Sequence, residues 1–180
     1  MKLMVASDLH GDAGCCEKLM DAWEREGVQR LFLLGDLLYH GPRNPVPERY
    51  DPRRVAALLN EKKDRIFCVR GNCDAEVDQM MLEFPILAES CILCAGDRLI
   101  YAAHGHRLEK GGMPSLRPGD VLLCGHTHVP AWEMRGENLY LNPGSASMPK
   151  EDSWRGYLIL TEKEATWKDL EGKVRHRLLL

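Results

Sequence analysis

Five short apolar runs in this chain each end at a side chain that can bind a metal ion. These side chains are Asp8, Asp36, Asn72, His104 and His126. Continuous apolar runs of this kind are typical of strands that are buried on both faces of a sheet. The carboxyl ends of parallel strands meet at one edge of the sheet, where binding sites form. We therefore expect the five side chains to converge, and His10 and His128, two residues beyond Asp8 and His126, to join them.

Each of these residues alone has an ordinary structural explanation. An isolated Asp or Asn often caps a helix or forms a turn, and an isolated His is often a packed core residue. Together they are harder to explain, because burying so many polar groups without a cation between them is costly. Carboxylate, amide oxygen and imidazole ligands without thiolate suit Mn²⁺, Fe²⁺, Zn²⁺, Ni²⁺ or Co²⁺. Seven donors exceed the needs of one ion, which predicts a pair of ions with a bridging carboxylate.

The order of apolar patterns predicts an α/β protein with two sheets. In the first part of the chain, strand patterns at 2–6, 30–34 and 66–69 alternate with helical patterns at 15–23 and 55–59. This alternation favours a parallel sheet covered by helices. The remaining strand-like runs, separated by Gly, Pro and charged clusters, lie at 81–87, 91–94, 99–103, 121–124, 132–134, 139–141, 157–160, 165–167 and 174–178. We expect those in the C-terminal third to form a β meander and a second sheet, giving a two-sheet sandwich flanked by helices in a single domain, 1–180.

Composition excludes several classes of protein. Hydrophobic residues make up 44% and charged residues 28% of the 180 residues, as in ordinary globular proteins. The net charge of −3 does not support nucleic-acid binding, which normally requires a basic surface. No run is long enough to span a membrane, and we expect a cytoplasmic protein. Seven cysteines, an odd number lying mostly in apolar runs, predict no disulfide framework, and the Cys91/Cys94 pair lacks the second pair of a zinc ribbon.

The polar blocks, taken in order, resemble those of the calcineurin-like metallophosphoesterases. The blocks are Asp8-Leu9-His10, Gly35-Asp36, Gly71-Asn72-Cys73-Asp74, His104-Gly105-His106 and Gly125-His126-Thr127-His128. The resemblance extends from residue 1 to about residue 150 and, with residues 142–145, points to the small bacterial and archaeal phosphodiesterases. It implies a four-layer α/β/β/α fold and two divalent ions, of which we expect Mn²⁺ before Ni²⁺, Co²⁺, Fe²⁺ or Zn²⁺.

The resemblance also implies a role for each candidate ligand. Asp8, His10 and His128 would hold the first ion, and Asp36 would bridge. The second ion would be held by Asn72, His104 and His126. The implied reaction is hydrolysis of a small phosphodiester by a hydroxide that bridges the ions and attacks phosphorus in line. His106 is expected behind the ligands, Asp74 is expected to be structural, and residues 142–145 are expected to close the site from beneath.

One position departs from the family pattern. Cys73 follows Asn72 where the superfamily usually has a histidine that contacts phosphate or protonates the leaving oxygen. A thiol is a poorer proton donor, so Cys73 predicts a preference for phosphodiesters and good leaving groups over alkyl monoesters. His40, Arg43 and Asn44 are candidates to contact the phosphate, and we expect specificity to lie in residues 40–52 and 109–118.

Three other functions remain open at this point. A retromer subunit resembles these small phosphoesterases yet acts as a non-catalytic protein-binding scaffold; such scaffolds lose ligands, whereas this chain has all seven. A two-metal amidohydrolase would also place His and Asp at strand ends, but the order of blocks fits phosphoesterases better. A nuclease would require a basic and aromatic surface that the sequence does not indicate. The sequence leaves the physiological substrate and the oligomeric state open, a homo-oligomer included.

Overall fold

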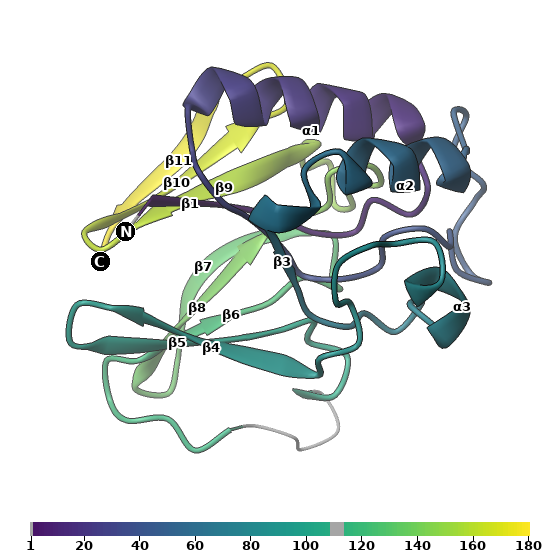
Figure 1. Cartoon of the computed structure of the whole chain (residues 1–180). Coiled ribbons are helices and arrows are strands. Elements are labelled where there is room, and N and C mark those ends of the chain that lie inside the picture. The colour runs from purple at the N-terminus through teal and green to yellow at the C-terminus, as the bar shows by residue number, and fades with distance from the viewer. Residues whose placement is uncertain (1, 109–113) are drawn as a thin grey trace.

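A computed structural model describes residues 2–108 and 114–180, which form two packed sheets with helices on one side (Figure 1). The first sheet has six strands in the order β11-β10-β9-β1-β2-β3. Its strands are β1 (Lys2–Ala6), β2 (Leu31–Leu33), β3 (Ile66–Cys68), β9 (Gly156–Thr161), β10 (Glu164–Asp169) and β11 (Val174–Leu179). β1, β2 and β3 run parallel, whereas β9 pairs antiparallel with β1 and continues into β10 and β11 through hairpins.

The second sheet has five strands in the order β4-β5-β6-β8-β7. Its strands are β4 (Ser90–Ala95), β5 (Arg98–Ala103), β6 (Val121–Leu123), β7 (Pro130–Arg135) and β8 (Asn138–Pro143). β5, β6 and β8 run parallel, and hairpins attach β4 and β7 at the two edges. The second sheet therefore also offers parallel carboxyl ends at which loops can gather.

Two helices cover the outer face of the six-stranded sheet, α1 (Ala13–Glu26) and α2 (Pro52–Asn60) (Figure 1). The side chain of Asp12 caps the start of α1 by accepting a hydrogen bond from the main-chain N–H of the third residue, and Gly27 ends it in the left-handed conformation. Asp51 caps α2 in the same way. Two further helical segments are short, α3 (Glu76–Gln79) and the 3₁₀ turn η1 (Lys63–Arg65).

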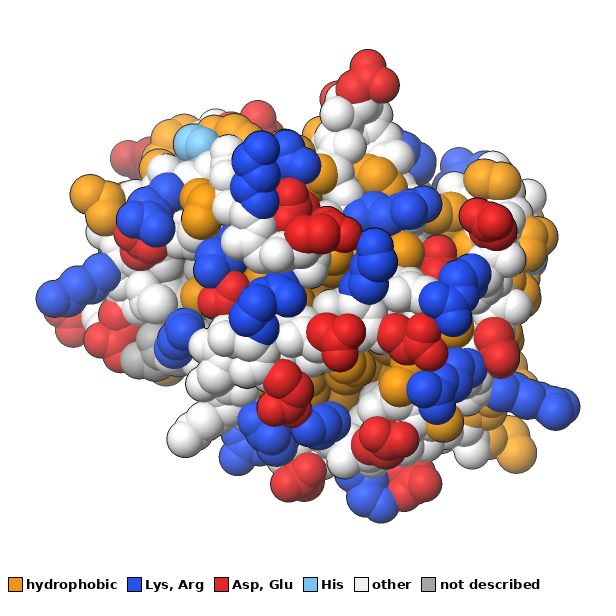
Figure 2. Space-filling view, turned by 90° about the horizontal axis from the view of Figure 1, so that it is seen from above, with side chains coloured by type: hydrophobic (Ala, Val, Ile, Leu, Met, Phe, Trp, Pro, Cys, Tyr) orange, Lys and Arg blue, Asp and Glu red, His pale blue; other side chains and the backbone are white. Residues whose placement is uncertain are grey.

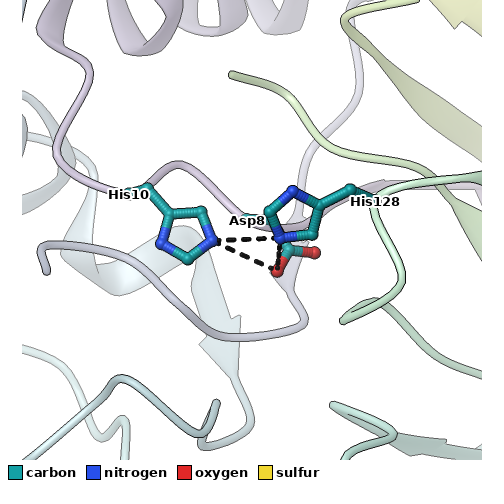
Figure 3. Close-up of side chains that lie close together, drawn as sticks. All are labelled: Asp8, His10 and His128. Carbon is teal, nitrogen blue, oxygen red and sulfur yellow. Dashed lines mark hydrogen bonds and ion pairs between the residues drawn. The ribbon is translucent and has the colours of Figure 1, made fainter. Parts of the chain in front are cut away.

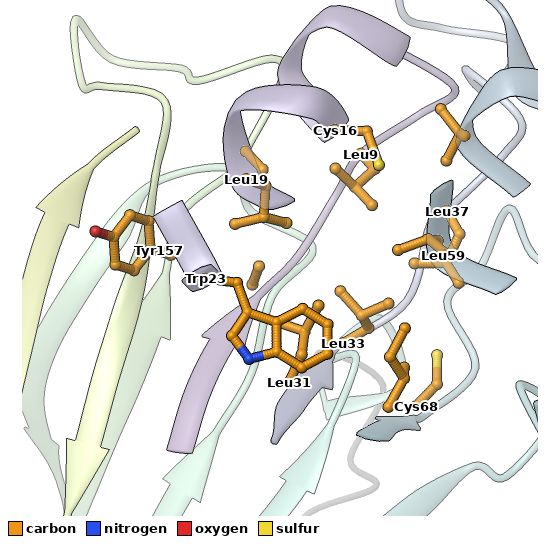
Figure 4. Close-up of a cluster of buried hydrophobic side chains, with 14 of the residues drawn as sticks. Leu9, Cys16, Leu19, Trp23, Leu31, Leu33, Leu37, Leu59, Cys68 and Tyr157 are labelled. Carbon is orange, nitrogen blue, oxygen red and sulfur yellow. The ribbon is translucent and has the colours of Figure 1, made fainter. Parts of the chain in front are cut away.

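The core has two layers, one on each face of the six-stranded sheet. Leu31 and Leu33 of β2 face the helices and pack in the same cluster as Trp23 of α1 (Figure 4). Phe32, between them, faces the second sheet and packs with Leu123 and its neighbours. Successive residues of a strand point to opposite faces, so a strand buried on both faces has to be apolar at every position.

The two-sheet α/β sandwich predicted from the sequence is confirmed, with differences in detail. Residues 81–87 are not a strand; they form turns whose Leu82, Phe84 and Ile86 fill the helix-side core. The C-terminal strands do not form one sheet, because β7 and β8 belong to the second sheet and β9–β11 extend the first. On the outer face of the second sheet, the side chains of Leu108 and Leu116 pack against Leu122, Cys124 and Tyr140.

All seven cysteines are free thiols, and several lie in the core. In the part of the chain that the structure describes, no helix has the length and apolarity needed to cross a membrane.

Candidate metal centre

The loops that follow β1, β2, β3, β5 and β6 bring the predicted donors to one rim between the sheets. Five of the seven are almost completely buried: Asp8, His10, Asp36, His104 and His128. Asn72 is exposed and His126 half-buried, and both line the cleft that leads to the buried group. Residues from position 8 to position 128 therefore meet at one site, as the strand-end pattern predicts.

One group of donors, the Asp8 cluster, consists of Asp8, His10 and His128 (Figure 3). Nε2 of His128 lies 3.3 Å from Oδ1 of Asp8, and Nε2 of His10 lies 3.6 Å from the same oxygen. The two Nε2 atoms are 3.2 Å apart. The three donor atoms thus form a small triangle of the size that encloses one cation.

A second group, the Asp36 cluster, consists of Asp36, Asn72 and His104. Nε2 of His104 lies 3.4 Å from Oδ2 of Asp36 and 3.1 Å from Oδ1 of Asn72. The same Asp36 oxygen lies 3.7 Å from Nε2 of His10, in the Asp8 cluster. Asp36 is therefore the carboxylate between the two groups. The ring of His126 lies beside that of His104, with their centroids 5.0 Å apart.

Backbone carbonyls orient three of the imidazoles. Nδ1 of His10 is 2.8 Å from the oxygen of Tyr39, and Nδ1 of His128 is 2.7 Å from that of Met148. Nδ1 of His104 contacts a carbonyl oxygen in the same way, at 2.6 Å. A carbonyl only accepts, so each Nδ1 donates its proton, and the neutral ring presents the bare lone pair of Nε2 to the centre. This is the orientation of a histidine that binds a metal.

The carboxylates are oriented by main-chain N–H groups. Oδ2 of Asp8 accepts from the N–H of His126 at 3.1 Å, and Oδ1 of Asp36 accepts from that of Cys73 at 2.8 Å. The other oxygen of each faces the imidazoles. Within the described residues, the buried Oδ1 of Asp8 has no hydrogen-bond partner. Facing lone pairs and an unpartnered carboxylate oxygen are satisfied by a cation, so the donors fit a divalent metal.

Five of the seven candidate ligands have a left-handed backbone. The φ angles are 58° for Asp8, 47° for His10, 56° for Asp36, 69° for His126 and 64° for His128. Non-glycine residues seldom adopt positive φ, which costs about 1–3 kcal/mol for each residue held there. This strain is concentrated at the rim, where it turns the chain sharply so that the donors point inward.

Two glycines are required by close backbone approach. A Cβ atom on Gly71 would lie 2.0 Å from Oδ1 of Asp36, and one on Gly125 would lie 1.9 Å from Oγ of Ser7. Only a residue without a side chain fits at these positions. The Gly-Asn and Gly-His pairs of the sequence therefore have a structural cause: the glycine lets one donor loop pack against another.

The electrostatics of the site favour a bound cation. Burial opposes ionisation of Asp8, but the imidazoles of His10 and His128, which approach its Oδ1, hold its pKa well below the usual range. Burial likewise opposes ionisation of Asp36, and His104 lowers its pKa. Burial would lower the pKa of His104, but Asp36 and Asp8 raise it to about 9. Both carboxylates are anionic at neutral pH, and His104 and His10, whose pKa values are raised, take up protons where no metal competes.

A cleft of about 510 Å³ opens above these donors. Of the residues predicted to contact phosphate, Arg43 and Asn44 line it, together with Cys73. His40 does not line it, because its ring packs against the rings of Tyr39 and Tyr50 at centroid distances of 4.8 and 5.3 Å. Of the second predicted specificity segment, residues 109–113 lie outside the described residues.

Several supporting residues were not assigned a specific contact from the sequence. The carboxylate of Asp74 accepts from the N–H groups of Asp36, Leu37 and Gly71 at 2.7–2.9 Å. It thereby fixes the loop of Asp36 to the loop of Asn72. This contact is the kind of structural role predicted for Asp74. The Gly-Asn-x-Asp spacing is the sequence signal, since an Asp two residues after a ligand can bind the ligand's own loop.

The segment from Asn142 to Ser147 holds the opposite side of the site. The hydroxyls of Ser145 and Ser147 both donate to the carbonyl oxygen of Asp8, at 2.8 and 2.7 Å. Nδ2 of Asn142 donates to the carbonyl oxygen of Gly125 at 2.7 Å. These contacts support the loop of Asp8 and the loop of His126 and His128, which together carry the Asp8 cluster. The segment lies beneath the donors, where the sequence predicts a closing segment.

Comparison with known protein families gives the same assignment as the geometry. The family model of the calcineurin-like phosphoesterase superfamily domain matches residues 1–165. The chain belongs to this superfamily. Members of this family of metallophosphoesterases use divalent metal ions, and the donors described above are this phosphoesterase's candidates to hold them.

Individual relatives of this phosphoesterase agree with that assignment. It is 46% identical over 160 residues to phosphodiesterase YfcE of Escherichia coli strain K12, an alignment that covers 89% of this chain and 87% of YfcE. Its fold matches the solved structure of YfcE, a phosphoesterase from E. coli, with a TM-score of 0.93 and 41% identity over 99% and 98% of the two chains.

The fold is also shared with Vacuolar Protein Sorting 29 from Cryptosporidium parvum. The TM-score is 0.63, with 16% identity over 99% of this phosphoesterase and 97% of that chain. At this identity the likeness concerns the fold alone. The function has to be argued from the site.

Proposed function

We propose that this chain is a metal-dependent phosphodiesterase. The observation that supports this most is the convergence of two anionic carboxylates and three lone-pair-presenting imidazoles at the floor of an open cleft. The 46% identity to a protein named phosphodiesterase YfcE supports the same activity. We propose that all 180 residues act as one domain, because both sheets contribute donors to the site.

We propose two divalent ions per chain, with Mn²⁺ as the preferred metal. The Asp8 cluster would hold one ion. Asn72, His104 and His126 would hold the other. Asp36 would contact both, since its Oδ2 lies 3.7 Å from Nε2 of His10 and 3.4 Å from Nε2 of His104. Bound divalent cations neutralise charge on a phosphoryl group and activate water for attack on phosphorus.

The protein groups around the cleft bind and orient the ester. Arg43 is exposed, lines the cleft and can pair with a phosphate oxygen, and Asn44 is held beside it because its Nδ2 donates to the carbonyl oxygen of His40 at 2.9 Å. Burial, followed by the charge of Asp36, raises the pKa of Cys73. Its thiol therefore stays protonated and donates weakly, which favours diesters with good leaving groups over monoesters.

The surface supports a small substrate. The net charge is −3, and on the helix-covered face shown in Figure 2 Lys and Arg alternate with Asp and Glu without a continuous basic stripe. Nucleic-acid backbones are bound by such stripes. We therefore propose a small organic phosphodiester, and we assign no role to a membrane or a nucleic acid.

The test is hydrolysis of bis(4-nitrophenyl) phosphate after chelation and after readdition of single metals. We expect activity to disappear on chelation and to return with Mn²⁺, with 4-nitrophenyl phosphate hydrolysed more slowly than the diester. A chain that binds metal but hydrolyses neither ester would instead be a scaffold that has kept its ligands.

A further inference from the structure

A second cavity, which we call the side cavity, opens next to the metal cleft. Its volume is about 910 Å³, within the range of cavities that bind small organic ligands. Asn44 and Lys150 line both the side cavity and the metal cleft. The two spaces are therefore adjacent, and a molecule bound at the metals can extend past these two residues.

The wall between the two spaces is tied to the metal donors. Nδ1 of His128 donates to the carbonyl oxygen of Met148, and the N–H of Lys150 donates to the carbonyl oxygen of His128 at 3.2 Å. The hydroxyl of Ser147 bonds to the main chain of Asp8. Ser147, Met148 and Lys150 also line the side cavity. One short segment thus positions a donor and shapes the neighbouring cavity.

Most of the basic side chains of the side cavity already have acidic partners. Lys18 pairs with Glu171 at 3.0 Å, and Arg175 pairs with Asp169 at 2.9 Å. Arg49 pairs with a glutamate at 3.0 Å. These pairs neutralise one another and offer little to an anionic ligand.

Two cations are different. Lys150 and Arg155 form no ion pair with any described residue. Nε of Arg155 donates to the carbonyl oxygen of Ser147 at 2.7 Å, which holds the side chain on the wall while its terminal nitrogens remain for a ligand. The one exposed acid of the lining with no ion-pair partner among the described residues is Glu48, on a separate segment of the chain. The wall beside the metal donors is therefore basic.

The rest of the lining includes apolar side chains. These are Val46, Pro47, Pro149, Trp154 and Leu170. Apolar and aromatic side chains with a few placed charges are typical of sites for organic molecules that have an apolar body and an anionic group. Arginine and lysine together are well suited to a phosphate.

We propose that the side cavity binds one ester substituent of the phosphodiester, and that this substituent carries a second phosphate held by Lys150 and Arg155. The inference rests on the proposed phosphodiesterase function, because it names the class of substrate: an organic phosphodiester with a second phosphate on an apolar or ring-containing substituent. The diester phosphorus lies at the metals, and the second phosphate lies beyond Lys150.

The kinetic test compares three chromogenic diesters. They are bis(4-nitrophenyl) phosphate, the 4-nitrophenyl ester of thymidine 5′-phosphate, and the same ester carrying a 3′-phosphate. All release 4-nitrophenolate, and only the last carries a second phosphate. We expect it to have the lowest KM. Arg155→Gln should raise the KM for the 3′-phosphorylated ester about tenfold more than it raises the KM for the other two diesters, with kcat little changed. A tenfold loss of affinity is expected when a charge-assisted hydrogen bond is removed.

Lys150→Gln is a second variant. The Lys150 side chain makes no hydrogen bond with a described residue, so its replacement leaves the wall intact. Arg155→Lys should recover part of the affinity. The matched control is Lys163→Gln, which removes an exposed cation of the β9–β10 turn, remote from both cavities. Equal KM for the two thymidine esters, or equal effects of Arg155→Gln on all three diesters, would overturn the proposal.

Binding distinguishes this inference from the proposed function. Calorimetric titration with thymidine 3′,5′-bisphosphate should show binding that Arg155→Gln weakens about tenfold and Lys163→Gln leaves unchanged. If no diester is hydrolysed but this difference persists, the site for the second phosphate stands and the phosphodiesterase assignment falls. If diesters are hydrolysed but the bisphosphate binds equally to wild type and Arg155→Gln, the assignment stands and the inference falls.

Discussion

The rim that presents the metal donors and the wall that faces the substrate are built in opposite ways. At the rim, the donors are mostly buried, five have a left-handed backbone, and three imidazoles are fixed by backbone carbonyls. The wall here includes every substrate-facing side chain of the two cavities, and its cations Arg43, Lys150 and Arg155 are exposed. The difference shows where geometric accuracy is needed: metal donors need fixed positions, whereas substrate contacts adapt to a ligand.

The largest effect is expected from the carboxylate between the two clusters. Asp36→Asn removes the negative charge that faces His10 and His104, and we expect kcat/KM for bis(4-nitrophenyl) phosphate to fall by about a thousandfold or more. Asp97→Asn, an exposed residue in the β4–β5 turn, is the matched control and should be neutral. Similar kcat/KM values in both variants would show that catalysis does not depend on the carboxylate of Asp36.

A smaller effect is expected from the residue that fixes the rim from behind. Asp74→Asn replaces a carboxylate oxygen that accepts main-chain N–H groups with an amide that itself donates. We expect a loss of about 1–3 kcal/mol in the free energy of unfolding and of about 10–100-fold in metal affinity. Urea unfolding and metal titration measure the two. An unfolding loss without any loss of metal affinity would reduce Asp74 to a purely structural residue.

Metal affinity should increase with pH. Without metal, Asp36 and Asp8 raise the pKa of His104 to about 9, and the pKa of His10 is raised as well. The protonated rings stabilise the metal-free fold below the unfolded-state pKa, and this contribution is lost as pH rises through the folded value. A metal displaces these protons, so its affinity should rise about tenfold per pH unit for each proton displaced, up to about pH 9. Calorimetric titrations between pH 6.5 and 8.5 measure this, and a flat profile would contradict it.

The smallest effect is expected at the border between rim and wall. Cys73 lines the cleft, and its main-chain N–H orients Asp36. Cys73→His supplies a better proton donor without changing that main-chain bond, so we expect the ratio of monoester to diester hydrolysis to rise several-fold. Matched 4-nitrophenyl mono- and diesters measure the ratio. An unchanged ratio would remove the side chain of Cys73 from the explanation of substrate preference.

The rim could be predicted from the sequence because each donor follows an apolar strand, and a parallel sheet gathers strand ends by construction. Its supports were harder to predict. The contact of Ser147 with Asp8 joins residues 139 positions apart in the sequence, and no local pattern marks such a pair. Residues 81–87 were misassigned to a strand because buried Leu82, Phe84 and Ile86 alternate as in a strand although they line a turn-rich segment.

The wall could not be predicted in the same way. His40 belongs to the same loop as Arg43 and Asn44, but its ring packs between two tyrosines and does not line the cleft. The side cavity is formed by four separate segments of the chain, so its shape follows from tertiary packing alone. Loop side chains have no periodicity from which their direction can be inferred.

The most direct test of the central claim is the number of divalent ions that the folded chain holds. After chelation and dialysis against Mn²⁺, elemental analysis should find two ions per wild-type chain, and anomalous scattering should place them on either side of Asp36. A correctly folded chain that retains no ion, or crystals in which Asp8, His10 and His128 surround no metal after reconstitution, would contradict the account.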